Sequence, residues 1–174
     1  MKENFDKAFD LVMKSEGGYV WDRNDAGGET NLGVTRKAWG AYLGRPVQDG
    51  EMKLLTREVV KPFYEKCYWA PVRGDQLPTG LDYAAFDFAV NAGPGQAARF
   101  IQRAAGTAAD GVIGPATLGV VQKADPEELL KKFSEEKEHF YKGIVERKPD
   151  QAKFLNGWLA RVEHVHTTAE SMIS

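Results

Sequence analysis

The chain of 174 residues lacks the features that mark a disulfide-stapled, membrane-spanning or nucleic-acid-binding protein. Its single cysteine, Cys67, excludes an internal disulfide. Its 23 basic and 25 acidic residues leave a net charge of −2, which offers no general attraction to nucleic acid or to an anionic membrane. No apolar run approaches the ~18 residues of a membrane span, and charges interrupt residues 1–15, where a signal peptide would need an apolar core. We expect a protein made in the cytoplasm without a signal peptide and with no stable membrane insertion.

Metal-binding patterns are also missing. His164 and His166 stand two apart on an expected helix, so they point to different faces, and no zinc-ligand spacing occurs. The segment from Asp22 imitates the start of a calcium loop, but Ala26 and Gly33 occupy positions that need oxygen-bearing side chains. We therefore expect neither a metal ion nor an organic cofactor.

Helical periodicity dominates what the chain does contain. Apolar residues at three- and four-residue spacing predict a helix over residues 5–13, which ends before Gly17-Gly18. Residues 81–90 are almost all apolar and rich in alanine, which predicts a buried central helix that ends at Gly93. Residues 19–32 predict irregular chain or a short β-hairpin. The fold class is mostly α with a small β element.

Capping residues mark further helices. Thr35, Thr56 and Asp125 stand at N-cap positions, and Pro115 suits a first helical position. Pro62 should kink the helix that follows Thr56 or mark its true start.

Three more segments complete the helical pattern. A helix is expected over residues 97–105, and the 15 charged side chains of residues 122–150 predict a solvated helix face. From Asp150 onwards the chain predicts an amphipathic helix that closes the core with Phe154, Leu155, Trp158, Leu159 and Val162.

Glu16 is the first candidate for chemistry. It stands where the first helix meets two glycines, with Tyr19 and a polar loop behind it. Burial and the negative end of a helix both raise the pKa of a carboxyl group, and a protonated acid can give its proton to a glycosidic oxygen. The competing interpretation is a surface glutamate at a fraying helix end, which is the commoner case.

The following loop holds a second carboxylate. Asp25 stands nine residues after Glu16, and a hairpin could fold it back across a cleft, as glycoside hydrolysis requires. Turns also use Asp, Asn and Thr for hydrogen bonds to their own backbone, so this spacing alone does not decide the matter. Among the four tryptophans, Trp21 is the one whose place in a polar loop favours contact with a sugar ring.

Two stretches resemble a known family. SEGGYVWDRNDAGGETNLGVT (residues 15–35) resembles the signature of glycoside hydrolase family 108, the muramidases of phage endolysins and secretion activators. DFAVNAGPGQAARFIQRAAGTAADGVIGPATLGVV (residues 87–121) resembles the peptidoglycan-binding region that accompanies it. The resemblance implies a lysozyme-like helical fold with a small β-hairpin near the active site. It also implies a catalytic region over residues 1–92 and a helical peptidoglycan-binding region over residues 93–174, packed into one body.

The same resemblance implies the activity and its catalytic residues. The family's reaction is hydrolysis of the β-1,4 bond between N-acetylmuramic acid and N-acetylglucosamine, and its catalytic glutamate corresponds to Glu16. Asp25 stands where the similar phage-type lysozymes have a second carboxylate. Where those enzymes hold the attacking water with a threonine, this chain has Asn31, with Thr30 one residue before it.

The substrate-binding residues implied by the resemblance are Tyr19, Trp21, Asn31 and Asn91. Trp21 replaces the smaller polar residue expected there, and Asn91 matches a family asparagine at the end of the central helix. The implied partner is the glycan strand of peptidoglycan.

Other functions stay open at this point. A lytic transglycosylase also relies on one glutamate but leaves 1,6-anhydromuramic ends, and it would not need Asp25. A non-catalytic peptidoglycan-binding or secretion-assisting protein would bind sacculi without releasing sugar. An amidase or peptidase lacks any zinc or Cys/His motif here. We expect a bacteriolytic monomer that acts on cell-wall peptidoglycan, reached with a holin or another export partner, in phage lysis or in bacterial secretion.

Overall fold

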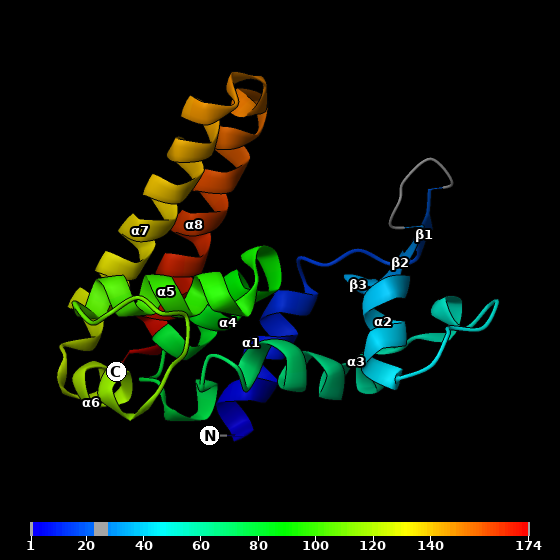
Figure 1. Ribbon diagram of the computed structural model, residues 1–174, viewed down its shortest axis with the longest axis horizontal. Coiled ribbons are helices and arrows are strands. Elements are labelled where there is room, and N and C mark those ends of the chain that lie inside the picture. Colours follow the sequence, from blue (N-terminus) through cyan, green and yellow to red (C-terminus); the bar gives the residue numbers. More distant parts are fainter. Residues whose placement is uncertain (1, 23–27, 174) are drawn as a thin grey trace.

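The computed structural model describes residues 2–22 and 28–173. These residues form eight α-helices and one small antiparallel sheet, so the predicted mostly α class is confirmed (Figure 1). The helices are α1 (Lys2–Met13), α2 (Arg36–Leu43), α3 (Arg57–Tyr64), α4 (Leu81–Ala92), α5 (Pro94–Ala105), α6 (Pro115–Lys123), α7 (Pro126–Arg147) and α8 (Ala152–Met172). The strands are β1 (Val20–Trp21), β2 (Glu29–Asn31) and β3 (Val34–Thr35). Short 3₁₀ turns cover Met52–Leu54, Gly74–Gln76 and Pro149–Gln151, and a π-helix covers Glu65–Trp69. None of the helices in these residues is long and apolar enough to cross a membrane.

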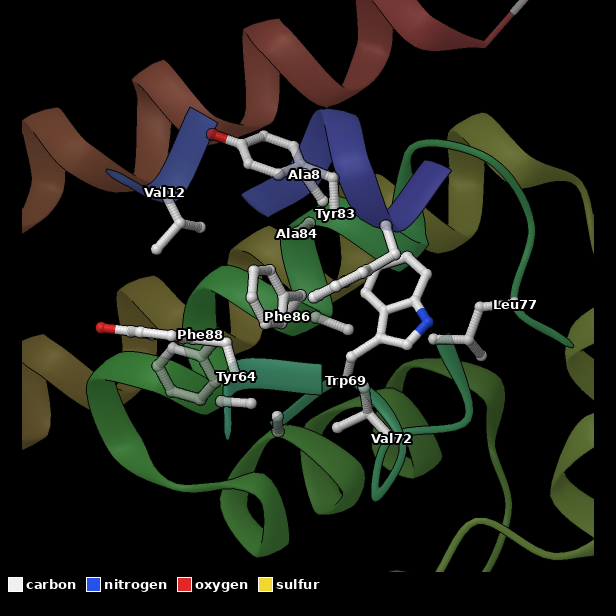
Figure 2. Close-up of a cluster of buried hydrophobic side chains, with 14 of the residues drawn as sticks. Ala8, Val12, Tyr64, Trp69, Val72, Leu77, Tyr83, Ala84, Phe86 and Phe88 are labelled. Carbon is white, nitrogen blue, oxygen red and sulfur yellow. The ribbon is translucent and has the colours of Figure 1, made fainter. Parts of the chain in front are cut away.

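Helix α4 is the buried central helix that the sequence predicts. Its first nine residues, 81–89, are all buried. Phe86 lies 5.7 Å from Trp69, ring centroid to ring centroid, and makes an edge contact with it (Figure 2). Phe88 stacks on Phe100 of α5 at 4.9 Å and meets Phe133 of α7 edge-on. One helix therefore joins the elements that precede it to the elements that follow it.

The predicted caps are confirmed. The side chains of Thr35, Thr56 and Asp125 accept hydrogen bonds from the third residue beyond, which satisfies an otherwise unpaired N–H at the start of α2, α3 and α7. Pro115 is the first residue of α6, as predicted.

Two boundaries differ from the prediction. Helix α5 begins at Pro94, three residues before the expected start, because Gly93 (φ +95°) ends α4 and proline suits a first helical position. Pro62 does not mark the start of α3, which begins at Arg57. The proline lies inside α3, and the chain passes into the wider π-helix directly after α3 ends.

The small sheet has the strand order β1-β2-β3 and extends the predicted hairpin by a third strand. Val20 pairs with Thr30, and Thr30 pairs in turn with Thr35. Leu32 and Gly33, between β2 and β3, both have positive φ, as a tight type I′ turn requires. This turn brings the sheet close to the end of α1.

Helices α7 and α8 form a long hairpin that projects beyond the rest of the molecule (Figure 1). The prediction that five apolar residues of α8 close the core is wrong for four of them. The buried residues of α8 are Val162, Val165 and Ala169, in its C-terminal half, whereas Phe154 is 45% exposed. The predicted solvated face of residues 122–150 is confirmed for their charged side chains, which are exposed apart from the partly exposed Glu136 and the buried Lys137.

Candidate active site

Glu16 stands three residues beyond the end of α1. Backbone hydrogen bonds from Ser15 to Val12 and from Glu16 to Met13 continue the helical path after the helix has formally ended. The Glu16 side chain is partly exposed. Burial raises the pKa of Glu16 above its ordinary value, as the sequence predicts, and this is the largest influence on it.

The β2–β3 turn holds the Glu16 carboxyl from one side. A Cβ atom added to Gly33 would lie only 2.6 Å from Oε2 of Glu16 and 2.6 Å from the hydroxyl oxygen of Tyr64. The buried Tyr64 hydroxyl donates a hydrogen bond of 2.6 Å to the carbonyl oxygen of Leu32. A glycine at position 33 therefore lets the sheet, the acid and the tyrosine approach one another, and it also tolerates the φ of +78°.

A charged pair faces Glu16 from the other side. Arg161 of α8 donates a hydrogen bond of 2.6 Å from Nη2 to Oδ1 of Asp87, which is buried in α4. Both charges reach Glu16: Arg161 lowers the pKa of its carboxyl, and Asp87 raises it. Asn91, one turn after Asp87, donates a weak hydrogen bond of 3.4 Å to the same carboxylate. The acid thus lies where the first half of the chain meets the last helix.

Lys137 adds a buried cation behind this pair. It is 2% exposed, and its ammonium group lies 5.1 Å from the ring centroid of Phe133 and 5.9 Å from that of Phe88. Burial lowers the pKa of Lys137 to about 8, against an opposing influence from Asp87. Lys137, Asp87, Asn91 and Arg161 line one small cavity with Tyr141.

The sheet residues divide between its two faces. Glu29 and Asn31 are buried, and Thr30 between them is partly exposed and points to the opposite face. The Asn31 amide donates a hydrogen bond of 2.8 Å to the Met52 carbonyl oxygen, and the Glu29 carboxylate accepts one of 2.7 Å from the Tyr19 hydroxyl.

The remaining predicted site residues are placed as follows. Trp21 is 53% exposed on β1. Asp25 lies outside the described residues. The sheet and the segment between α1 and β1 supply five of the predicted site residues: Glu16 and Tyr19 precede β1, Trp21 lies in β1, and Thr30 and Asn31 lie in β2. Asn91 comes from α4.

The described residues hold no group of three or more His, Cys, Asp or Glu side chains able to bind a metal ion. Cys67 packs partly buried against the core. His166 of α8 shares a hydrogen bond of 2.9 Å with Ser134 of α7, and this contact joins the two helices of the hairpin.

The sequence analysis did not identify four residues in this region, and the local sequence sets only one of them apart from its neighbours. Asp87 and Asp82 are the two charged residues of the mostly apolar helix α4, and a charge in such a helix indicates a buried role. Arg161, Lys137 and Tyr64 lie far from Glu16 in the chain, and nothing in their local pattern indicates that the fold gathers them around one carboxyl group.

A partly buried carboxyl group of raised pKa is chemically able to act as a general acid in the hydrolysis of a glycosidic bond. The family model described as Glycosyl hydrolase 108 matches residues 9–93, and the one described as Predicted Peptidoglycan domain matches residues 96–163. The solved structure titled "Structure of Brucella abortus SagA" is 36% identical in sequence, with a TM-score of 0.86 over 99% of this chain and 97% of that one. No curated protein matches the chain. The chain belongs to glycosyl hydrolase family 108 and is a peptidoglycan hydrolase of lysozyme-like fold.

Proposed function

We propose that the chain is an N-acetylmuramidase, which hydrolyses the β-1,4 bond between N-acetylmuramic acid and N-acetylglucosamine with Glu16 as its general acid. The observation that carries this proposal is the Glu16 carboxyl group itself. It is partly buried, its pKa is raised by burial, and it lies against Gly33 and Tyr64. A carboxyl group kept protonated towards neutral pH can donate its proton to a glycosidic oxygen.

The reaction follows from that proton transfer. Glu16 donates its proton to the leaving O4, the bond from this oxygen to the anomeric carbon breaks, and positive charge develops on the sugar ring. Water supplies the hydroxyl group that completes the new reducing end. We assign Asp25 the role of stabilising the positive charge or positioning the water, together with Thr30. The exposure of Thr30 on the face opposite to Glu29 and Asn31 supports its part.

The proposed substrate-binding residues in and beside the sheet divide into one that can touch a sugar ring and two that shape the sheet. The exposed indole of Trp21 supports direct contact with a sugar ring. The hydroxyl of Tyr19 and the amide of Asn31 are engaged inside the protein, which favours an indirect role in shaping the sheet. Asn91, beside Asp87, is proposed to contact substrate next to Glu16.

We also propose a division of labour along the chain, with catalysis in residues 1–92 and peptidoglycan binding in residues 93–174. The ranges of the two matching family models support this division. The ion pair between Asp87 and Arg161 supports the view that the two regions act as one body, because it crosses the boundary between them.

The test is a chemical identification of products. Purified sacculi are digested with the protein, and the released fragments are reduced with borohydride and weighed by mass spectrometry. Reduced muramic acid ends are expected. Reduced glucosamine ends would contradict the bond assignment. Anhydromuramic ends would identify a lytic transglycosylase, and Asp25→Asn should then leave the rate unchanged.

A further inference from the structure

The upper half of the α7–α8 hairpin carries a row of aromatic rings that remain partly exposed. Tyr141 of α7 stacks on Trp158 of α8, with ring centroids 5.2 Å apart and planes 26° apart. Phe154, one turn before Trp158 on α8, continues the row at 5.8 Å and 31°. Tyr141 and Trp158 are partly exposed and Phe154 is 45% exposed. These three rings are called the aromatic strip below.

Two rings of the aromatic strip share a helix face with Arg161. Phe154, Trp158 and Arg161 follow one another at the four- and three-residue spacing that places side chains on one face of a helix. Arg161 is the residue that pairs with Asp87 and whose charge reaches Glu16.

Tyr141 of the strip also lines the small cavity beside Asp87, together with Asn91 and Arg161. The seven steps from Phe154 to Arg161 rise about 10 Å along α8, which is the scale of a disaccharide. One ring of the strip therefore lines the cavity that also holds Asp87 and Arg161, the two residues whose charges reach Glu16.

The chemistry of this surface suits a glycan strand. The ring faces of pyranoses carry C–H groups that pack on aromatic rings, and such rings are large and rigid contact surfaces. At the foot of the strip, the Arg161 side chain is 31% exposed, so part of this cation can reach a sugar bound beside the first ring. At the outer end, the Lys153 ammonium lies 5.2 Å from the Phe154 ring centroid, where it can meet the carboxylates of stem peptides.

We propose that Tyr141, Trp158 and Phe154 form a saccharide-binding strip, which holds the glycan strand of peptidoglycan along the α7–α8 hairpin on one side of the bond that Glu16 cleaves. This inference rests on the proposed function and adds to it the surface that makes the second region a peptidoglycan-binding one. In this proposal the projecting tip of the α7–α8 hairpin binds substrate, and its base closes the core.

The test measures binding apart from cleavage. Phe154→Ala and Trp158→Ala are each combined with Glu16→Gln in the full chain, and binding is measured by co-sedimentation with two probes. The probes are intact sacculi and glycan strands stripped of their stem peptides. The matched control is Val59→Ala, also combined with Glu16→Gln, because Val59 is a 47% exposed apolar residue on α3, outside the region assigned to peptidoglycan binding. Each strip variant should bind both probes about tenfold more weakly, and the Val59→Ala control should bind as well as Glu16→Gln alone.

Several outcomes would overturn the strip. Unchanged binding by both variants would do so, and so would a loss confined to intact sacculi, because that result would identify a peptide site. A dimer that Phe154→Ala dissociates would identify a self-association face instead. Loss of the stacked Trp158 ring endangers the hairpin itself, so the exposed Phe154 provides the decisive variant, and its unfolding temperature should equal that of the parent. If the wild type releases no muramic ends but the strip variants still lose binding, the proposed function fails and the strip stands.

Discussion

Gly33 offers a direct test of how the sheet positions the carboxyl group of Glu16, the proposed general acid. In a Gly33→Ala variant, the new Cβ would meet Oε2 of Glu16 and the hydroxyl oxygen of Tyr64 at 2.6 Å, about 0.8 Å short of ordinary contact. The backbone there has φ +78°, a left-handed conformation that costs a residue with a side chain about 1–2 kcal/mol. Alanine recovers about 0.4–1 kcal/mol of this by restricting the unfolded chain.

Gly28 supplies the matched control, because it has a similar φ of +65° but an added Cβ would meet no atom of a described residue within 4 Å, its chain neighbours aside. Gly28→Ala should lower the free energy of unfolding by about 1 kcal/mol and leave activity within a few-fold of wild type. Gly33→Ala should lose more stability and should also displace the acid. A displacement approaching 1 Å costs about 100-fold in rate.

The assay combines urea unfolding with the rate of sacculus clearing. If Gly33→Ala clears sacculi as fast as Gly28→Ala, the contact between the turn and Glu16 does not position the acid, and the reasoning is refuted.

Two further predictions concern the charges behind Glu16. Asp87→Asn removes a negative charge that raises the pKa of Glu16, so this pKa should fall and the alkaline limb of the pH–rate profile should move to lower pH. The free energy of unfolding should also fall by about 2 kcal/mol, because Arg161 loses its charged partner. An alkaline limb that does not move would contradict the coupling between Asp87 and Glu16. Lys137→Met should be more stable than wild type below pH 8 by about 3 kcal/mol, because folding there buries a charged ammonium whose pKa is lowered to about 8. Wild-type stability rises relative to the variant between about pH 8 and 10.5, where only the unfolded lysine holds its proton, and a pH-independent difference in urea unfolding would count against this.

Local chemistry made much of the fold predictable. Three N-cap residues, Thr35, Thr56 and Asp125, correctly predict where their helices begin, because their side chains accept hydrogen bonds from residues only three positions away. The apolar, alanine-rich run of residues 81–90 likewise indicates a helix buried on every side. Glu16 was a candidate because a helix end, two glycines and a polar loop meet there, but its position alone favoured a surface glutamate, and only the family resemblance pointed to a catalytic role.

The surroundings of Glu16 were not predictable in this way. The periodicity of apolar residues shows which face of a helix is apolar, but it does not show which distant helix places a charged side chain beside Glu16. Arg161 reaches Asp87 across 74 residues, and Lys137 is buried although its neighbours in the chain are charged. The apolar side chains at the start of α8 show the same limit, because the pattern of a core-facing helix also fits a projecting hairpin with exposed Phe154.

The most direct test of the central claim compares Glu16→Gln with wild type in the release of reducing ends from purified sacculi. Glu58→Gln serves as the control, because Glu58 is an exposed glutamate on α3. Glutamine keeps the size of the side chain but has no proton to give, so Glu16→Gln should lose about 10²–10⁴-fold in rate while it still binds sacculi and unfolds near the wild-type temperature. Glu58→Gln should remain as active as wild type. A folded Glu16→Gln variant that releases reducing ends at the wild-type rate would contradict the account.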